Sequence, residues 1–270
     1  MIRKTKKQTI IDNVYTQNGT KEMENIFGKA GIFPFPKPTG LLVQLIEICD
    51  LQDDDIVLDF FAGSCTTADA MFQYNVINNI KSRCVSVQLP EPCEYNSLAA
   101  KSGYINIADI GKVRICRASD KIKKEHPGCE GDLGFKVLKL DSSNIKSWDV
   151  NFDDLEQSLL DSIGNIKGNR SEEDVLYEIL LKYGLDLTLP IETRMIESKK
   201  VFSIGLGALV ICLDSHITLD VVEGIGKLKA ELEPEVMRVV FKDNGFKDDV
   251  VKTNAIQILK RYDIEDVKSL

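Results

Sequence analysis

The chain has 270 residues, enough to bury a core in one large or two modest domains. Its hydrophobic content of 43% is ordinary for a globular protein, which argues against a disordered chain. No apolar run reaches the ~18 residues of a membrane span, and no apolar segment follows the first lysines. We therefore expect neither a membrane segment nor a secretion signal.

The net charge of −8 argues against a nucleic-acid binder that uses its whole surface. Basic and acidic residues balance within residues 1–130, so the acidic excess lies in residues 131–270, where we expect no DNA contact. The seven cysteines form no C-x-x-C pair, and only two histidines could join them. This argues against a zinc site and indicates the reduced thiols of a cytoplasmic protein.

Residues 1–36 are predicted to form an ordered arm, whose basic opening is a solvated tail rather than a DNA site. Pro36-Lys37-Pro38 predicts an extended entry into an amphipathic helix. Pro38 and Thr39 stand at the start of this helix, where backbone N–H groups and the Lys37 ammonium can meet a carboxylate. A helix merely begun by a proline fits the same residues.

The most informative stretch is D-I-V-L-D-F-F-A-G-S-C-T-T at residues 55–67. Its apolar start predicts a buried parallel strand, Gly63 predicts a tight turn, and the threonines predict the start of a helix. Such a strand, turn and helix present free N–H groups to an anionic ligand, and Asp59 at the strand end can hold an ammonium group or an ordered water. A glycine turn with nothing bound explains this stretch, taken alone, equally well.

Residues 84–89 predict a second parallel strand, which ends at Pro90-Glu91-Pro92. Ligands of doubly wound sheets lie at the carboxyl ends of the strands, so an acidic side chain just past this strand can accept both ribose hydroxyls of a nucleoside. We choose Glu91 for that role, with Gln88 and Glu94 as weaker candidates. An unpaired surface glutamate is the alternative.

A further helix is predicted from about Tyr104 to Ala118, with Ile107, Gly111 and Ile115 on its apolar side. Its other face carries four basic residues: Lys112, Arg114, Arg117 and Lys121. This face either contacts DNA phosphates or is simply solvated.

A break at His126-Pro127-Gly128 places a domain boundary near residue 130. We expect a smaller α/β domain after it, without recognisable chemistry, in which His216 is structural. The predicted elements are a capped helix from Ser171 to Gly184, strands at 201–204 and 208–213 joined by a hairpin turn at 205–207, a helix at 219–229, a strand at 238–241, a turn at 243–245 and a last helix through Tyr262.

D-F-F-A-G-S-C-T-T at residues 59–67 resembles the S-adenosylmethionine motif of DNA amino-methyltransferases, whose usual form is D-x-F-x-G-S-G-T-T. Other segments resemble, in the family's order, the adenine-specific modification subunit of type III restriction systems. They are G-T-K-E-M-E-N-I-F-G at 19–28, F-P-F-P-K-P-T at 33–39, V-S-V-Q-L-P-E-P at 85–92, I-A-D-I-G-K-V-R at 107–114 and F-K-V-L-K-L-D-S-S-N at 135–144. Several linked motifs in one order are more specific than any single one.

The resemblance implies an α/β fold with a partial Rossmann-like sheet in residues 37–130, preceded by the arm of residues 1–36 and followed by a C-terminal domain of residues 131–270. It implies S-adenosylmethionine as the cofactor, no metal, a cytoplasmic location and methyl transfer to adenine N6 of DNA. The implied partners are DNA in the complete enzyme, an N-terminal methyltransferase half or a dimer partner, and a restriction subunit. The expected cofactor contacts are Lys37, Pro38, Thr39, Asp59, Phe60, Phe61, Ala62, Gly63, Ser64, Cys65, Thr66, Gln88 and Glu91.

The chain departs from this family in two respects. No Asp-Pro-Pro-Tyr-type catalytic motif occurs, because no two of the eight prolines adjoin. In the type III class that motif and the target-reading region precede the cofactor motifs. We therefore expect this chain to be the C-terminal part of a modification methyltransferase, without catalytic residues and inactive alone.

The second departure is Cys65, which stands where the family has glycine. Its side chain is expected either to crowd the ligand or to require a left-handed backbone, at a cost of ~1 kcal/mol. The crowding argument predicts that Cys65→Gly tightens cofactor binding.

Two other functions remain open from the sequence. The chain could be a degenerate remnant or interaction module that no longer binds the cofactor. A nicotinamide dehydrogenase fits less well, because Gly63-x-Cys65 fails the dinucleotide fingerprint.

Overall fold

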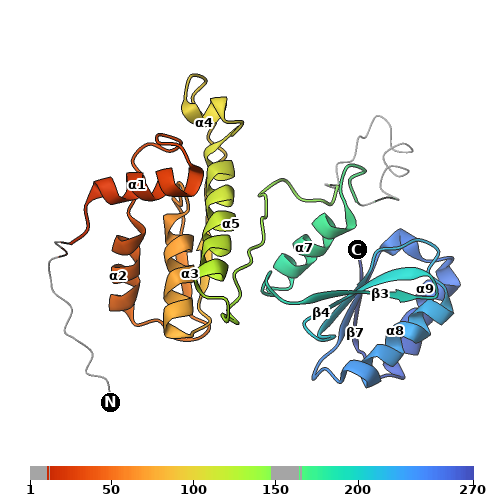
Figure 1. The fold of residues 1–270 in the computed structure, drawn as a ribbon. Helices are drawn as coiled ribbons and strands as arrows, with labels where there is room; N and C mark the ends of the chain where they lie inside the picture. The colour runs from red at the N-terminus through yellow and green to blue at the C-terminus, as the bar shows by residue number, and fades with distance from the viewer. Residues whose placement is uncertain (1–10, 12, 147–163, 165) are drawn as a thin grey trace, which may run out of the picture. The chain divides into compact units, whose positions relative to one another are not determined.

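The computed structural model describes residues 11, 13–146, 164 and 166–270. The chain divides into two compact units, Met1–Phe135 and Lys136–Leu270 (Figure 1). The boundaries predicted near residues 36 and 130 remain predictions. The chain contains both helices and strands, which agrees with the predicted α/β fold class. No helix in the described residues is long and apolar enough to cross a membrane.

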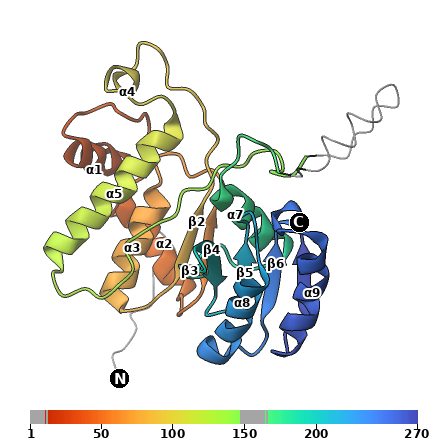
Figure 2. The same cartoon turned by 90° about the vertical axis from the view of Figure 1, so that its right-hand side faces the viewer.

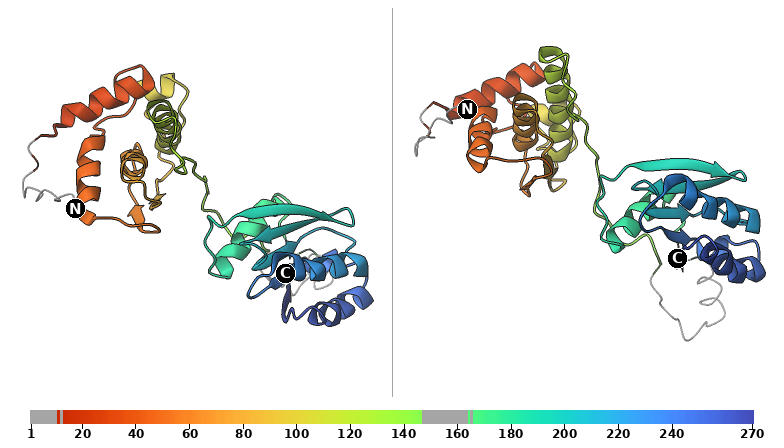
Figure 3. Two further views of the ribbon diagram at one scale, coloured as in Figure 1. Left: turned by 60° about the horizontal axis from the view of Figure 1, so that its bottom comes forward. Right: turned by 90° about the horizontal axis from the view of Figure 1, so that it is seen from below.

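In the first unit, helices α2 (Thr39–Cys49), α3 (Thr66–Asn78) and α5 (Ile107–Glu125) pack on one face of a two-stranded parallel sheet. Strand β1 (Ile56–Asp59) pairs with β2 (Arg83–Ser86), so that Asp59 lies opposite Ser86. Its other helices are α1 (Thr16–Phe27) and α4 (Leu98–Lys101). Helix α3 contacts both α2 and α5, and Figure 3 shows the three helices beside one another.

The core of this unit covers only the inner face of the sheet. Val57 of β1 and Cys84 of β2 pack against buried side chains of α2 and α3, among them Ile46, Ala70 and Met71. The side chains that alternate with them, such as Leu58 and Val85, are exposed. Strand residues alternate between the two faces of a sheet, so one whole face of this apolar sheet faces outward.

Most predicted elements of the first unit are confirmed, with small shifts at their ends. The helix predicted after Pro38 begins at Thr39, and the central strand runs directly into the predicted turn. The second strand ends at Ser86 rather than at residue 89. The predicted arm contains a helix that the sequence did not suggest, α1, which packs against α5.

The second unit has a five-stranded mixed sheet in the order β3-β4-β5-β6-β7. Strands β3 (Ile191–Ile196), β4 (Lys199–Ile204) and β5 (Leu209–Cys212) are antiparallel neighbours, whereas β6 (Arg238–Phe241) and β7 (Asp266–Ser269) continue parallel to β5. Helix α7 (Glu172–Lys182) packs on one face of this sheet. Helices α8 (Leu219–Leu232) and α9 (Asp249–Lys260) pack on the other face (Figure 2).

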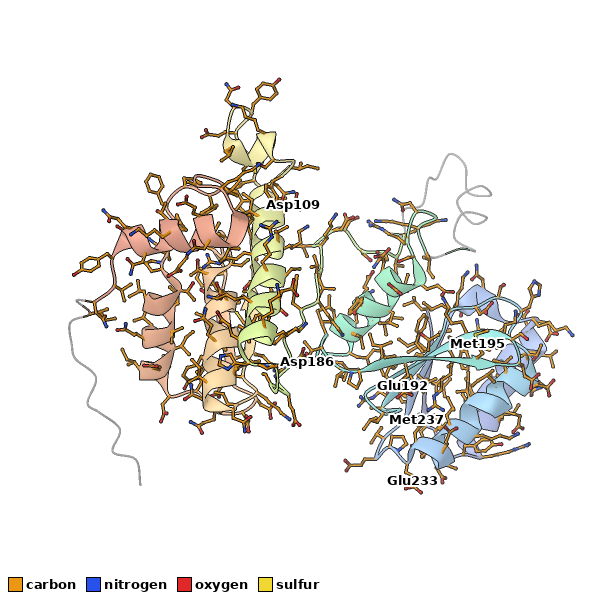
Figure 4. The ribbon with its side chains drawn as sticks, in the orientation of Figure 1. Asp109, Asp186, Glu192, Met195, Glu233 and Met237 are labelled. Carbon is orange, nitrogen blue, oxygen red and sulfur yellow. The ribbon has the colours of Figure 1, made fainter. Side chains whose placement is uncertain are left out.

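The second unit follows the sequence prediction closely. The strands expected at 201–204, 208–213 and 238–241 are β4, β5 and β6, the turn at Gly205–Gly207 joins the first two, and a 3-10 turn spans Asp243–Gly245. Ser171 and Asp174 form the expected capping box of α7. The two outer strands, β3 and β7, were missed. In this unit Met195 on β3 is exposed, whereas Met237, just before β6, is buried (Figure 4).

Candidate functional site

The candidate site is the loop that joins β1 to α3 at the carboxyl end of the parallel strand pair. Gly63 and Cys65 both adopt left-handed backbone conformations, with φ of +53° and +59°. The N–H of Cys65 donates to the carbonyl oxygen of Ala62 at 2.7 Å, which closes a tight turn, and α3 begins at Thr66. The predicted strand, turn and helix start are present, and the backbone of residues 62–66 lies at the sheet edge. The prediction of a buried strand is wrong for one face, where Ile56 and Leu58 are exposed.

Asp59 orders this loop from within. One carboxylate oxygen accepts a hydrogen bond from the N–H of Phe61 at 3.2 Å, and the other accepts from the Thr67 hydroxyl at 2.6 Å. The side chain is half-buried. Asp59 therefore ties the end of β1 to the first turn of α3 and keeps only part of its carboxylate accessible to a ligand.

Gln88 links the second strand to the glycine turn. Its side-chain oxygen accepts the N–H of Gly63 at 2.7 Å, and the N–H of Ala62 donates to the Val87 carbonyl at 3.1 Å. The structure thus brings together Asp59, Gly63 and Gln88, which the sequence places in two separate segments. Glu91 lies just beyond, with an exposed side chain, as an acid past the second strand should.

Two aromatic rings flank the loop on its outer side. Phe60 is 61% exposed and Phe61 is 79% exposed, and their ring centroids lie 5.0 Å apart. Large exposed rings are unusual on a soluble surface and commonly mark a binding surface. Here they follow the carboxyl end of β1 directly.

The start of α2 is not open to a ligand in the way the sequence suggested. The N–H of Thr39 donates to the carboxylate of Glu22 at 2.8 Å, and the Thr39 hydroxyl lies 2.7 Å from the same oxygen. The expectation that this donor is free for an external carboxylate is therefore wrong, because α1 supplies one from within the chain. Lys37 remains exposed, and Pro38 is buried as the N-cap residue.

Three of the expected contact residues turn their hydroxyl groups inward. Thr39, Ser64 and Thr66 are buried, and all three hydroxyls accept hydrogen bonds from the guanidinium of Arg114. At the loop, only the backbone groups of Ser64 and Thr66 remain available to a ligand, because Glu22 already accepts the N–H of Thr39. The hydroxyl groups serve the interior of the unit instead.

Of the four residues on the basic face expected for the next helix, Arg114 does not lie at the surface. Arg114 is fully buried, Lys112 pairs with Asp109 at 2.6 Å, and Arg117 donates to the Ile26 carbonyl at 2.9 Å. Figure 4 labels Asp109 in the first turn of α5. Lys121 lies 3.8 Å from Glu125. Lys112 is half-buried, and Arg117 and Lys121 are exposed, so three of the four residues still lie on a solvated face. Contact of this face with DNA stays an untested alternative.

A signal in the sequence could have identified Arg114 as a buried residue. It lies four residues after Ile110 and four before Ala118, and both neighbours are buried. This i, i+4 spacing puts the arginine within the apolar stripe of α5 rather than opposite it.

Cys65 points into the interior of the first unit. Its side chain is 6% exposed and packs with Ala62, Ala68 and Ile115. A Cβ atom on Gly111 of α5 would lie 2.6 Å from its sulfur, so the sulfur fills the space that this glycine leaves. Burial raises the pKa of the thiol to about 11. The left-handed backbone is as expected, and the buried position of the sulfur gives the crowding argument no support.

A cavity of about 200 Å³ lies between α3 and α5, lined by Asp69, Gln73, Ala118 and their neighbours. Its lining residues come from α3, α5 and the residue that follows α5, and do not include the glycine turn. Among the described residues, no group of three or more His, Cys, Asp or Glu side chains could hold a metal ion.

Comparisons with known proteins bear on this site. A family model described as DNA methylase matches residues 2–76, which include β1, the glycine turn and most of α3. A stretch of 126 residues is 38% identical to the Mod subunit of the type III restriction-modification enzyme StyLTI of Salmonella typhimurium. A stretch of 123 residues is 40% identical to the EcoP15I Mod subunit of Escherichia coli.

A third relative comes from a different system. The chain is 34% identical over 106 residues to the type II methyltransferase M.KpnI of Klebsiella pneumoniae. The aligned stretches cover 46%, 45% and 39% of this chain but only 19%, 18% and 25% of the three relatives. The matched part of this chain therefore spans a quarter or less of the length of these curated proteins.

Proposed function

Because this chain resembles DNA methylases and, among them, the modification subunits of type III restriction-modification enzymes, we propose that its first unit is the S-adenosylmethionine-binding part of a DNA adenine-N6 methyltransferase. The observation that carries the proposal is the loop from Asp59 to Thr66 at the carboxyl end of two parallel strands, with Gln88 hydrogen-bonded to Gly63. In Rossmann-like sheets, nucleotide cofactors bind at this edge.

The proposed roles follow from exposure and hydrogen bonding. The exposed Glu91 carboxylate accepts the ribose hydroxyls, and Lys37 at the entry to α2 pairs with the cofactor's carboxylate. The exposed rings of Phe60 and Phe61 lie where the flat apolar adenine ring can rest. The backbone of Ala62, Gly63, Ser64, Cys65 and Thr66 forms the floor, which Asp59 and Gln88 hold in place. Pro38 leads into α2 beside Lys37, and Thr39 is linked to the loop through Arg114.

The bound cofactor supplies an electrophilic methyl group. The remaining requirement is a set of acceptors that polarise the adenine amine, held in a pocket that receives the flipped base. The sequence contains no Asp-Pro-Pro-Tyr-type motif that could provide them. We therefore assign this chain binding and orientation of the cofactor, and we assign the amine chemistry to another polypeptide or segment.

The outward face of the β1–β2 sheet supports a partner of this kind. Ile56, Leu58, Val85 and Val87 are 55%, 58%, 47% and 47% exposed on an apolar parallel sheet. Parallel strands are normally covered on both faces. The occupant we propose is the catalytic half of a methyltransferase, whose strands and helices would extend and cover this sheet.

Beyond that half, we propose the partners of the type III class: a second modification subunit, a restriction subunit and DNA, which binds only to the complete enzyme. Such an enzyme acts on DNA in the cytoplasm. The acidic second half of the chain is consistent with contacts to protein rather than to phosphate.

Calorimetric titration of the chain with S-adenosylhomocysteine, the demethylated cofactor, tests the proposed site. We expect saturable binding, weakened about tenfold by Glu91→Ala because a charged acceptor of two hydroxyls is lost. Asp120→Ala removes an exposed carboxylate of α5 that has no proposed role, and it serves as the matched control, with unchanged affinity. Equal affinities for the wild type and Glu91→Ala would refute the ribose assignment.

A second function is favoured by one observation. Glu22 already occupies the N–H of Thr39, where a cofactor carboxylate was expected. A chain that no longer binds the cofactor and acts as an interaction module would explain this contact. The absence of any binding in the titration, with association to a methyltransferase half preserved, would favour this alternative.

A further inference from the structure

Arg114 is the best-connected buried side chain near the candidate site. It is fully buried, and its Nε and Nη2 atoms each lie 3.2 Å from one oxygen of Asp69, which is itself buried. Its Nη1 atom donates to the hydroxyls of Ser64 at 3.1 Å and Thr66 at 2.7 Å. Its Nη2 atom donates to the Thr39 hydroxyl at 2.8 Å.

These contacts reach the glycine turn and three of the helices around it. Ser64 belongs to the glycine turn, Thr66 and Asp69 to the first turn of α3, and Thr39 to the first turn of α2. Helix α1 contributes the sulfur of Met23 at 3.6 Å and the Glu22 carboxylate at 3.9 Å. One side chain of α5 therefore links the start of α2, at Thr39, to the glycine turn and the start of α3, at Ser64 and Thr66.

A buried charge is costly unless it is paired and hydrogen-bonded. If only stability mattered, an apolar side chain of similar volume would fill the same space at no disadvantage. A guanidinium adds a planar set of donors in fixed directions, which sets the relative positions of its acceptors. Here the acceptors are the hydroxyls of the loop and of the α2 start.

We propose that Arg114 is a positioning residue, which fixes the distance between the glycine loop and the start of α2 and so sets the geometry of the ligand site. This inference rests on the proposed cofactor site for its functional consequence. Arg114 itself lies beneath the loop and touches no ligand. Its effect passes through Ser64, Thr66 and Thr39.

Arg114→Lys keeps the charge but loses the planar fork, so it separates positioning from charge. We expect it to raise the dissociation constant for S-adenosylhomocysteine about tenfold or more. Met71→Ala is the matched control. It removes a buried side chain of α3 that belongs to a different core cluster, so it destabilises the unit without touching the network. We expect this control to bind as the wild type does.

Thr66→Val offers a second variant in case Arg114→Lys does not fold. It removes the acceptor of the 2.7 Å bond and keeps the side-chain shape. We expect weaker binding, and in combination with Arg114→Lys we expect less than the sum of the two effects, because both act through one contact. Additive effects on the dissociation constant would show that Arg114 is merely structural. So would a dissociation constant that rises in proportion to the loss of stability in both Met71→Ala and Arg114→Lys.

A readout without cofactor keeps this inference separate from the proposed function. Cys65 lies in the loop and Cys212 lies in the second unit, and burial raises the pKa of each thiol to about 11. We expect Arg114→Lys to speed alkylation of Cys65 by iodoacetamide, measured by peptide mass spectrometry, relative to Cys212 and relative to Cys65 in Met71→Ala. An unchanged Cys65 rate would overturn the positioning role. If Arg114→Lys speeds Cys65 alkylation but the wild-type chain binds no S-adenosylhomocysteine, the positioning role is supported and only the proposed function is refuted.

Discussion

At the scale of single residues, the loop depends on a pair that the sequence does not reveal. Cys65 needs the space that Gly111 leaves on α5, since a Cβ atom on Gly111 would approach the sulfur to 2.6 Å. The cysteine therefore occupies a glycine-like backbone conformation with its side chain buried behind the loop. We therefore expect the first unit to tolerate a larger side chain at position 111 better when the sulfur at position 65 is removed.

We expect Gly111→Ala to destabilise the first unit by about 1–3 kcal/mol, the usual cost of an extra carbon atom in a packed core. Cys65→Gly should restore part of this loss in the double variant, because it removes the clashing sulfur. The measurement is the midpoint of denaturant unfolding. Gly40→Ala, at a helical glycine with no atom within 4 Å of the added carbon, is the control and should cost nothing.

A neutral Gly111→Ala, or a double variant no more stable than the single one, would contradict this packing. For the ligand side, the buried sulfur changes the earlier expectation for Cys65→Gly. We now expect unchanged cofactor affinity rather than tighter binding, since the side chain removed lies in the interior of the first unit.

The sequence predicted the positions of the polar groups at the loop but not their partners. Asp59, Gly63 and Gln88 lie at the sheet edge because strand ends and a glycine turn follow from local patterns. The buried network around Arg114 joins four helices and the glycine turn, so it depends on tertiary packing that no local pattern encodes. Only the spacing of Arg114 within the apolar stripe of α5 indicated that this residue is buried.

At the scale of elements, the missed strands have identifiable causes. β3 is followed by a two-residue turn of Glu197 and Ser198, both with positive φ. Such turns are usually marked by Asn or Gly, so the hairpin had no turn signal. β7 is a short strand, D-V-K-S, whose parallel partner β6 lies more than twenty residues earlier in the chain. By contrast, the strands that the sequence predicted correctly have apolar runs or a neighbouring glycine turn.

Helix α7 anchors the segment before it through one acidic residue. The carboxylate of Glu178 accepts from the Ser143 hydroxyl and from the Asn144 N–H, both at 2.6 Å, and lies 3.0 Å from Lys182. Burial alone would raise the pKa of Glu178, but these hydrogen bonds and the lysine outweigh it and hold the pKa at about 2. Hydrogen bonding to Arg170 likewise lowers the pKa of nearby Asp141 to about 2.

A carboxylate whose pKa is depressed in the folded state stabilises the fold above its unfolded pKa, and this contribution is lost as the pH falls. We expect protection of α7 against hydrogen exchange to decline between about pH 4.5 and pH 2. Glu178→Gln should flatten this decline, whereas Glu173→Gln, on the exposed side of the same helix, should not. Identical pH profiles for the wild type and Glu178→Gln would rule out this anchor.

At the scale of the whole molecule, the first unit carries a sheet with one covered and one uncovered face. Val57 packs on helices α2 and α3, whereas the adjacent Leu58 is 58% exposed. Leu58→Lys should therefore leave the isolated chain as stable as the wild type but block association with a catalytic half. Val57→Lys should unfold the first unit, which distinguishes the two faces of one strand.

The most direct measurement is incorporation of tritiated methyl groups from S-adenosylmethionine into DNA. It is run with this chain alone, and then with a polypeptide that carries an Asp-Pro-Pro-Tyr motif and the target-reading region of a type III modification subunit. We expect no incorporation by the chain alone, incorporation by the mixture, and none when the mixture contains Leu58→Lys. Robust incorporation by the isolated chain, or none by a mixture whose components associate, would contradict the proposed division of binding and catalysis.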